Sequence, residues 1–181
     1  MQSSRSSVRL TRRQFVAAGA IGGAALAVGY SARGHGGWDF LSDAQASTLA
    51  ALCDRIVPAD DFPSATQAGV VTYIDRQLAR TYRRYRNTYR DGLERSDEMS
   101  RQRFGRDLAA LPAQQQVEIV GAIEQQNRKF FDLVRSHTLE GYYGSPRHGG
   151  NRDAVSWRML GLAEPPVLGR AQYDLRKGPA S

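Results

Sequence analysis

The stretch from residue 112 to 143, PAQQQVEIVGAIEQQNRKFFDLVRSHTLEGYY, says most about the fold class. Apolar residues recur along it at the three- and four-residue spacing of an amphipathic helix. They are Val117, Val120, Ile123, Phe130, Phe131 and Val134. Proline is favoured in the first turn of a helix, where Pro112 would lie. We therefore predict one long helix over residues 112–143 with a single buried face.

Three more helices are expected upstream of this stretch. Ser42 and Gln45 form the pattern of a capping box, and Pro58 marks the end of the helix that they begin. A second helix is predicted over about residues 67–81 and a third over 96–111, with residues 82–93 continuing one or starting the other. No segment alternates apolar and polar residues, as a β-strand would, for more than a few residues. We predict a mostly α-helical domain of about four to five helices, with an ordered glycine-rich loop region near its C-terminal end.

The composition fits one globular domain of modest size, with 181 residues and a formal net charge of +7. Four of the positive charges lie in the first 32 residues, and the remainder is too mildly basic to indicate nucleic-acid binding. Arginines interleave with tyrosines in residues 82–90, which can bind single strands, but packing on the core or on a partner is the preferred interpretation. The single cysteine, Cys53, is interpreted as a buried apolar residue, with an intersubunit disulfide as the alternative.

The N-terminal residues 11–17, TRRQFVA, resemble a twin-arginine export motif, with Arg12, Arg13 and Phe15 as its signature. About thirteen weakly apolar residues follow, fewer than the roughly twenty that a membrane span needs. An uncleaved membrane anchor is the alternative. We predict a signal peptide over 1–32, a linker over 33–41, a helical domain over 42–165 and a tail over 166–181. The expected location is the periplasm or the outer face of the membrane, reached through the Tat translocase.

The segment 137–151, HTLEGYYGSPRHGGN, gathers residues that often do chemistry. His137 and Glu140 are three positions apart and could share a helical face, with His148 and Asp153 as further metal ligands, but no HExxH motif is present. The glycines do not form GxGxxG after a strand, which a dinucleotide site requires. No GxSxG motif accompanies the segment, which argues against an esterase.

Backbone shape is the remaining interpretation of this segment. Glycine permits close approach and positive φ angles, Pro146 favours a turn, and tyrosine and tryptophan are enriched at protein interfaces. The residues concerned are Gly141, Gly144, Gly149, Gly150, Tyr142, Tyr143 and Trp157. Such a loop either closes its own fold or docks against another protein.

Several blocks together resemble the gluconate 2-dehydrogenase subunit 3 family, over roughly residues 8–162. They are the twin-arginine motif, CDRIVPADDFPSATQAGVVTYID, SRQRFGRDLAALPAQQQ and HTLEGYYGSPRHGGNRDAVSWRMLGL. The most specific block matches the family pattern at His137, Thr138, Glu140, Gly141, Pro146, Gly149, Gly150, Asn151, Asp153, Trp157, Leu160 and Gly161. His148 departs from it, because the family usually has tyrosine there.

The resemblance implies a non-catalytic small subunit without a cofactor of its own. Its partner would be a large FAD-containing subunit of the glucose–methanol–choline type, exported as a passenger and matured with the help of this chain, with a c-type cytochrome accepting electrons. The expected partner-interface residues are His137, Glu140, Gly141, Tyr143, Pro146, Gly149, Gly150, Asn151, Asp153 and Trp157. Two alternatives are a self-standing exported enzyme that uses His137, Glu140 and His148, and a membrane-anchored helical binding protein.

Overall fold

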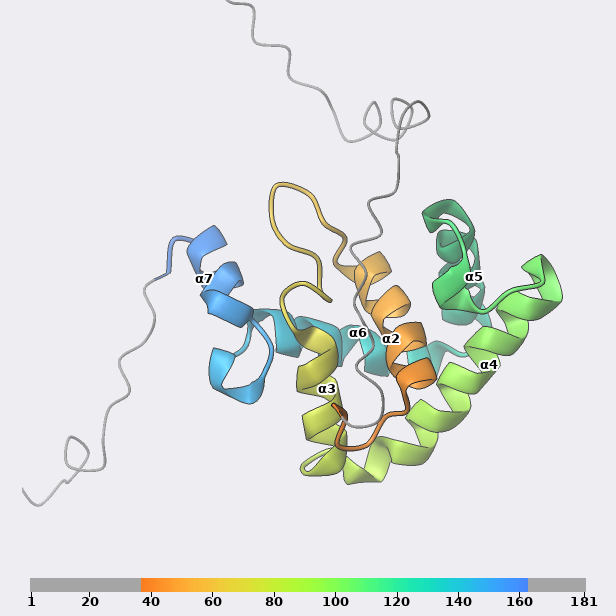
Figure 1. Cartoon of the computed structure of the whole chain (residues 1–181), viewed down its shortest axis with the longest axis horizontal. Helices are drawn as coiled ribbons and strands as arrows, with labels where there is room; N and C mark the ends of the chain where they lie inside the picture. The colour runs from red at the N-terminus through yellow and green to blue at the C-terminus, as the bar shows by residue number, and fades with distance from the viewer. Residues whose placement is uncertain (1–36, 163–181) are drawn as a thin grey trace, which may run out of the picture. The chain divides into compact units, whose positions relative to one another are not determined.

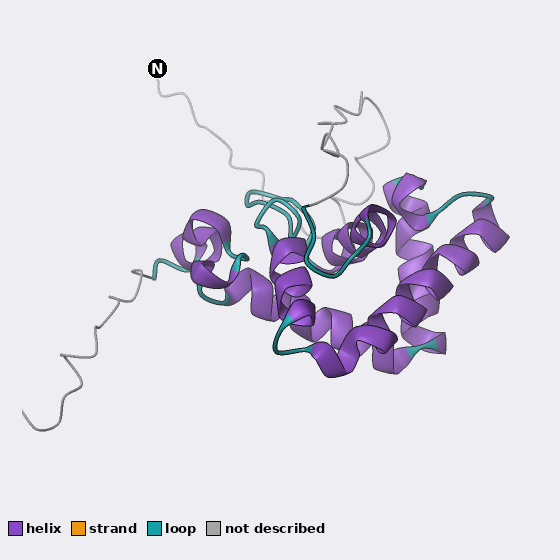
Figure 2. Ribbon diagram, turned by 60° about the horizontal axis from the view of Figure 1, so that its bottom comes forward, coloured by secondary structure: helices purple, strands orange, loops and turns teal. Residues whose placement is uncertain are grey.

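A computed structural model describes residues 37–162, and this part of the chain is helical, with loops and no strand (Figures 1 and 2). Its α-helices are α2 (Asp43–Ile56), α3 (Val70–Ala79), α4 (Arg86–Phe104), α5 (Ala113–Gln126), α6 (Arg128–Tyr143) and α7 (Val155–Met159). Four 3₁₀ turns connect them: η1 (Arg83–Tyr85), η2 (Leu108–Ala110), η3 (Pro146–His148) and η4 (Arg152–Ala154). The mostly α-helical fold class is thereby confirmed. The predicted signal peptide with Arg12, Arg13 and Phe15, and the predicted tail over 166–181, lie outside the described residues.

Helix α2 is the centre of the domain, since it contacts α3, α4, α5 and α6 (Figure 1). Its predicted capping box is present: Gln45 N donates to Ser42 Oγ over 3.2 Å, and Ser42 N donates to Gln45 Oε1 over 3.0 Å. The helix places Leu49, Leu52 and Cys53 in the core, each at most 2% exposed. Burial raises the pKa of the Cys53 thiol to about 12, which makes it an inert apolar residue, as predicted.

Helix α3 begins three residues later than the predicted position 67 and ends two residues before 81. Residues 65–69 form turns instead, and Gly69 has a φ of 82° immediately before the helix. A left-handed residue at this point cannot be helical, so the apolar periodicity could not reveal the true start. The core residues Val70, Val71, Ile74 and Leu78 face inward as expected.

For the third helix, expected over 96–111, the predicted C-terminal end is wrong. Of the two alternatives for residues 82–93, the one in which they start this helix is confirmed from Arg86 on. Helix α4 begins at Arg86, because Tyr82–Tyr85 form a turn and the 3₁₀ element η1 between α3 and α4. It ends at Phe104, where Gly105 adopts a left-handed φ of 73°. Leu108 and Leu111 are nonetheless buried, since η2 folds them back onto α2.

The single long helix over 112–143 is also wrong, because Asn127, with φ −136° and ψ 57°, separates α5 from α6. Asparagine competes with helical hydrogen bonding, and the seven-residue spacing from Ile123 to Phe130 is unaffected by the interruption. Val117, expected in the core, is 52% exposed, while Ile119 takes the buried position. The buried face of this stretch therefore differs from the predicted one near its start.

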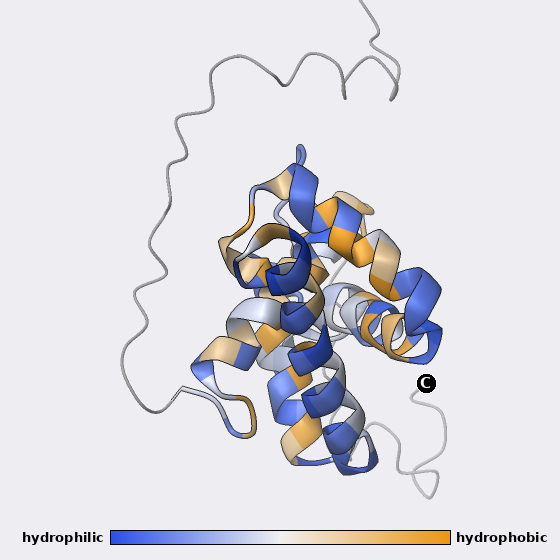
Figure 3. Ribbon diagram, turned by 90° about the vertical axis from the view of Figure 1, so that its right-hand side faces the viewer, coloured by the Kyte–Doolittle hydropathy of each residue, from blue (hydrophilic) through white to orange (hydrophobic). Residues whose placement is uncertain are grey.

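The helices carry hydrophobic bands on one side and hydrophilic ones on the other, as amphipathic helices around one core should (Figure 3). Of the helices within residues 37–162, none is both long and apolar enough to cross a membrane.

Candidate functional site

His137 lies within a stack of aromatic rings rather than on an open surface. Its side chain, in α6, is 4% exposed. The Tyr82 ring stacks on one side with a centroid distance of 4.2 Å, and the Tyr89 ring is nearly parallel to it at 5.8 Å. The Tyr89 hydroxyl and His137 Nδ1 are 2.9 Å apart, which makes a hydrogen bond. Burial lowers the pKa of His137, so the imidazole is neutral at pH 7.

Glu140, one turn further along α6, is hydrogen-bonded to two tyrosines. Its Oε2 accepts a hydrogen bond from the Tyr82 hydroxyl and a second, over 3.3 Å, from the Tyr73 hydroxyl. Burial and the bond to Glu140 raise the pKa of Tyr82, so this phenol stays protonated and donates. We refer to Tyr73, Tyr82, Tyr89, His137 and Glu140 as the tyrosine–histidine cluster.

The tyrosine–histidine cluster joins three helices at one point. Tyr73 comes from α3, Tyr82 from the turn before η1, Tyr89 from α4, and the two remaining members from α6. The expectation that the tyrosines pack on the core is confirmed for Tyr89, which is fully buried. Because every polar member has a hydrogen-bond partner, the cluster is satisfied internally and stabilises the packing of α6 on its neighbours.

Two glycines allow the loop after α6 to pack against the helix itself. A Cβ on Gly150 would lie 2.1 Å from the Gly141 carbonyl oxygen, and one on Gly141 would lie 2.7 Å from the Tyr73 ring. Real Cβ atoms do not approach other atoms this closely, so both positions exclude any side chain. Within this block, these glycines therefore serve close packing of the chain on itself.

Asn151 and Trp157 hold the ends of the loop together. Asn151 is fully buried; its Nδ2 donates to Gly144 O and its Oδ1 accepts from Ser156 N, both over 2.9 Å. Trp157 Nε1 donates to Tyr143 O over 2.9 Å. Together these three bonds connect the C-terminal end of α6 and the loop after it to α7, and so fix the position of this short helix.

The backbone between Gly149 and α7 is unusual. Asn151, Asp153 and Ala154 have φ angles of 45°, 56° and 52°, a region that non-glycine residues rarely occupy. Arg152 N, in the middle of this run, donates to Ala68 O over 2.9 Å and ties it to the turn before α3. The strained run forms the turn by which the chain enters α7.

The predicted interface residues thus divide into two groups. His137, Gly141, Gly150 and Asn151 are buried within this chain and shape the loop. Tyr143, Glu140 and Asp153 are exposed, and Pro146, Gly149 and Trp157 are partly exposed. Only the second group has surface that a partner could touch, and the interface role of its members stays a prediction.

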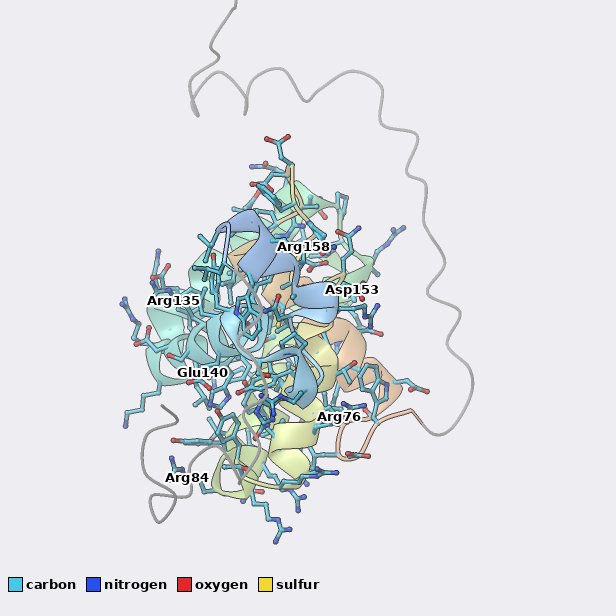
Figure 4. The ribbon with its side chains drawn as sticks, turned by 90° about the vertical axis from the view of Figure 1, so that its left-hand side faces the viewer. Arg76, Arg84, Arg135, Glu140, Asp153 and Arg158 are labelled. Atoms are coloured by element: carbon cyan, nitrogen blue, oxygen red, sulfur yellow. The ribbon has the colours of Figure 1, made fainter. Side chains whose placement is uncertain are left out.

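The side chains considered as alternative metal or catalytic groups do not come together as one site. His148 is exposed in η3, whereas His137 is enclosed by Tyr82 and Tyr89. Within residues 37–162, no three His, Cys, Asp or Glu side chains are arranged to hold a metal ion. Asp153 is exposed beside Arg152 and Arg158 around a shallow hollow, on the face viewed in Figure 4.

Sequence reasoning missed the buried carboxylate of Asp75. This α3 residue is 2% exposed and accepts three backbone hydrogen bonds, from the amides of Asp39, Phe40 and Leu41, over 2.6–2.9 Å. It ties the segment before α2 to α3. An acidic residue on the buried side of an apolar helical stripe is the signal that could have indicated it.

The fold and the site define a small all-α domain. Its most distinctive block, which begins at His137, packs largely within the chain. The family model described as gluconate 2-dehydrogenase subunit 3 matches residues 43–163, about two thirds of the chain. The chain belongs to this family, as the sequence blocks predicted, and hence to a class of subunits of multi-subunit dehydrogenases. No curated protein and no solved structure shows significant similarity to it.

Proposed function

We propose that this chain is the non-catalytic small subunit of an exported FAD-dependent sugar or alcohol dehydrogenase. It carries the twin-arginine signal for the complex and acts as folding and export partner of the flavoprotein subunit, which is of the glucose–methanol–choline type. The observation that carries the proposal is the motif TRRQFVA ahead of a domain that belongs to the subunit 3 family.

The described residues support a non-catalytic role for this chain. Two side chains of the family block that are suited to proton transfer already have partners: His137 pairs with Tyr89, and Glu140 pairs with Tyr73 and Tyr82. A self-standing enzyme using His137, Glu140 and His148 would need a substrate to reach an imidazole that is 4% exposed. Catalysis and the FAD therefore belong to the partner in this proposal, and a c-type cytochrome removes the electrons.

Export of the partner tests the proposal directly. The flavoprotein is co-expressed with the full chain, and its amount in the periplasm is measured. Changing both Arg12 and Arg13 to Lys should retain the flavoprotein in the cytoplasm. The matched control changes Arg5 and Arg9 to Lys, which makes the same substitutions in the same segment outside the motif, and should export normally. Periplasmic flavoprotein in the absence of this chain, or unaffected by the change at Arg12 and Arg13, would refute the export role.

The non-catalytic role is tested on the purified chain. It should show no flavin absorbance and no turnover of sugars with an artificial electron acceptor, while the co-purified complex shows both. Turnover by the isolated chain would overturn the proposal.

A further inference from the structure

The outer side of α7 and the end of α6 carry an apolar surface with no cover within the described residues. Three of the large hydrophobic side chains that are exposed among residues 37–162 lie here: Tyr143 at 42%, and Leu160 and Leu162 at 55% each. Trp157 adjoins them, since it bonds to Tyr143 O and its own carbonyl accepts from Leu162 N. Exposed apolar residues gathered in one place mark interaction sites more often than scattered ones do.

A hollow of about 390 Å³ lies between α7 and the turn that precedes α3, so the hollow and this apolar surface share α7. Its apolar part is formed by Pro63, Ala68 and Val155, and its charged part by Arg152, Asp153 and Arg158. The two arginines and Asp153 are all exposed. We call Tyr143, Trp157, Leu160, Leu162 and this hollow the α7 surface.

The charge around the α7 surface is positive. Arg76, which lies against Gly149, and Arg147 in η3 are exposed and add to Arg152 and Arg158. Asp153 and Glu140, the latter one turn before Tyr143 in α6, offset two of these four charges. Figure 4 looks onto this side and shows Arg158 next to Asp153, with Arg76 farther away and Glu140 on the same side. A guanidinium group binds a carboxylate through two parallel hydrogen bonds, so the chemistry of this surface selects an acidic ligand.

We propose that the α7 surface is where an acidic, apolar-rich segment of the flavoprotein subunit docks, with an apolar side chain in the hollow and a carboxylate between Arg152 and Arg158. The inference rests on the proposed function, because it takes the partner from there. It adds which surface of this chain is used and what chemistry the partner must present.

Other occupants fit the α7 surface less well. A two-fold dimer would bring two copies of the same net positive surface together, which repels. Residues 163–181 contain Arg170, Arg176 and Lys177 against Glu164 and Asp174, so the net charge of their side chains is also positive. An anionic lipid surface would match the charge. A planar membrane surface could not fill the hollow, however, whereas a protruding side chain could.

The first test measures binding of the purified flavoprotein to the full chain. The double change Arg152→Glu with Arg158→Glu should weaken binding by tenfold or more, roughly the effect of losing one buried charge pair. The control Arg90→Glu with Lys129→Glu makes the same charge change at exposed positions on α4 and α6, and should bind like the wild type. Circular dichroism and thermal unfolding must be unchanged in both variants, which separates docking from folding.

The second test locates the contact. A photo-cross-linking residue at Leu160 should capture an acidic segment of the flavoprotein. The same residue at Val117, which is 52% exposed and so closely matched to Leu160, should not. If the wild-type chain binds no flavoprotein, the proposed function fails; if it binds and both the charge variant and the cross-links behave like their controls, only the docking site is wrong.

Two further outcomes would also overturn the docking site. One is sedimentation of the wild-type chain with anionic vesicles that is lost on changing Arg152 and Arg158 to Glu. The other is a concentration-dependent dimer of the wild-type chain that the same change abolishes.

Discussion

At His137, a buried imidazole couples folding stability to pH. Burial lowers its pKa in the folded chain, while the unfolded imidazole titrates near its ordinary value of about 6.5. The unfolded state therefore binds more protons between these two pKa values, so the stabilising contribution is complete above about pH 6.5 and is lost as the pH falls through the folded pKa.

We therefore expect His137→Gln to flatten the dependence of unfolding free energy on pH below about pH 6.5. Urea unfolding at several pH values measures it. The matched control is His148→Gln, which removes an exposed histidine and should leave the slope as in the wild type. An unchanged slope in the His137 variant would mean that this imidazole is not the group that titrates.

The close contact of Gly150 with the Gly141 carbonyl gives a second prediction at the residue scale. Gly150→Ala should destabilise the chain by about 1–3 kcal/mol, because the added methyl meets backbone that must move. Gly121→Ala is the control, since Gly121 lies within α5 and a Cβ there meets nothing within 4 Å. That change should instead stabilise by about 0.5–1 kcal/mol. Thermal unfolding of both variants measures the difference, and a neutral Gly150→Ala would contradict the packing described here.

At the scale of elements, Asp75 connects the segment before α2 to α3. An amide in its place loses the charge and can serve fewer of the three backbone donors. We expect Asp75→Asn to cost about 1.5–3 kcal/mol, the range of a hydrogen bond to a charged group. Hydrogen exchange of the Asp39, Phe40 and Leu41 amides should also accelerate.

The control for this element is Asp91→Asn, an exposed carboxylate of α4. It should leave stability and exchange at residues 39–41 unchanged. If the Asp75 variant exchanged these amides at the wild-type rate, Asp75 would not be what holds the segment that follows the predicted export signal.

At the scale of the whole molecule, α2 contacts four other helices, so a cavity in it should weaken all of them together. Leu49→Ala should destabilise by about 2–5 kcal/mol, because Leu49 is fully buried. Val117→Ala, at an exposed position, should change stability by less than about 0.5 kcal/mol.

Cooperativity provides the measurement for this prediction. Tryptophan fluorescence reports on Trp38 and Trp157, near opposite ends of the described residues, and circular dichroism reports on the helices. In both variants the two signals should change at the same temperature. Separate transitions would show that the region of α7 unfolds independently of α2.

Each of the four predicted helices has a counterpart in the structure, but several of their boundaries and the short helix α7 were not predicted, for reasons visible in particular residues. Apolar periodicity identified α2 and its capping box because both depend on neighbours in sequence. It could not reveal the interruption at Asn127, since the seven-residue step from Ile123 to Phe130 is the same in one helix or two. The left-handed Gly69 and Gly105 likewise changed helix ends without disturbing the pattern.

The sequence by itself determined the all-α class, the inert buried cysteine and the family, because periodicity and motif spacing are local properties. Only the tertiary structure decided how the family block is used. Four of its residues are buried by packing within the chain: His137, Gly141, Gly150 and Asn151. Among the side chains that are exposed to solvent are Tyr143, Leu160, Leu162 and the arginines near them. Which residues of the block are buried depends on which side chains face Tyr73, Tyr82 and Tyr89. These tyrosines lie about 50 to 70 positions before His137 and Glu140 in the chain. No local pattern carries this information, since contacts between distant segments form only when the helices pack.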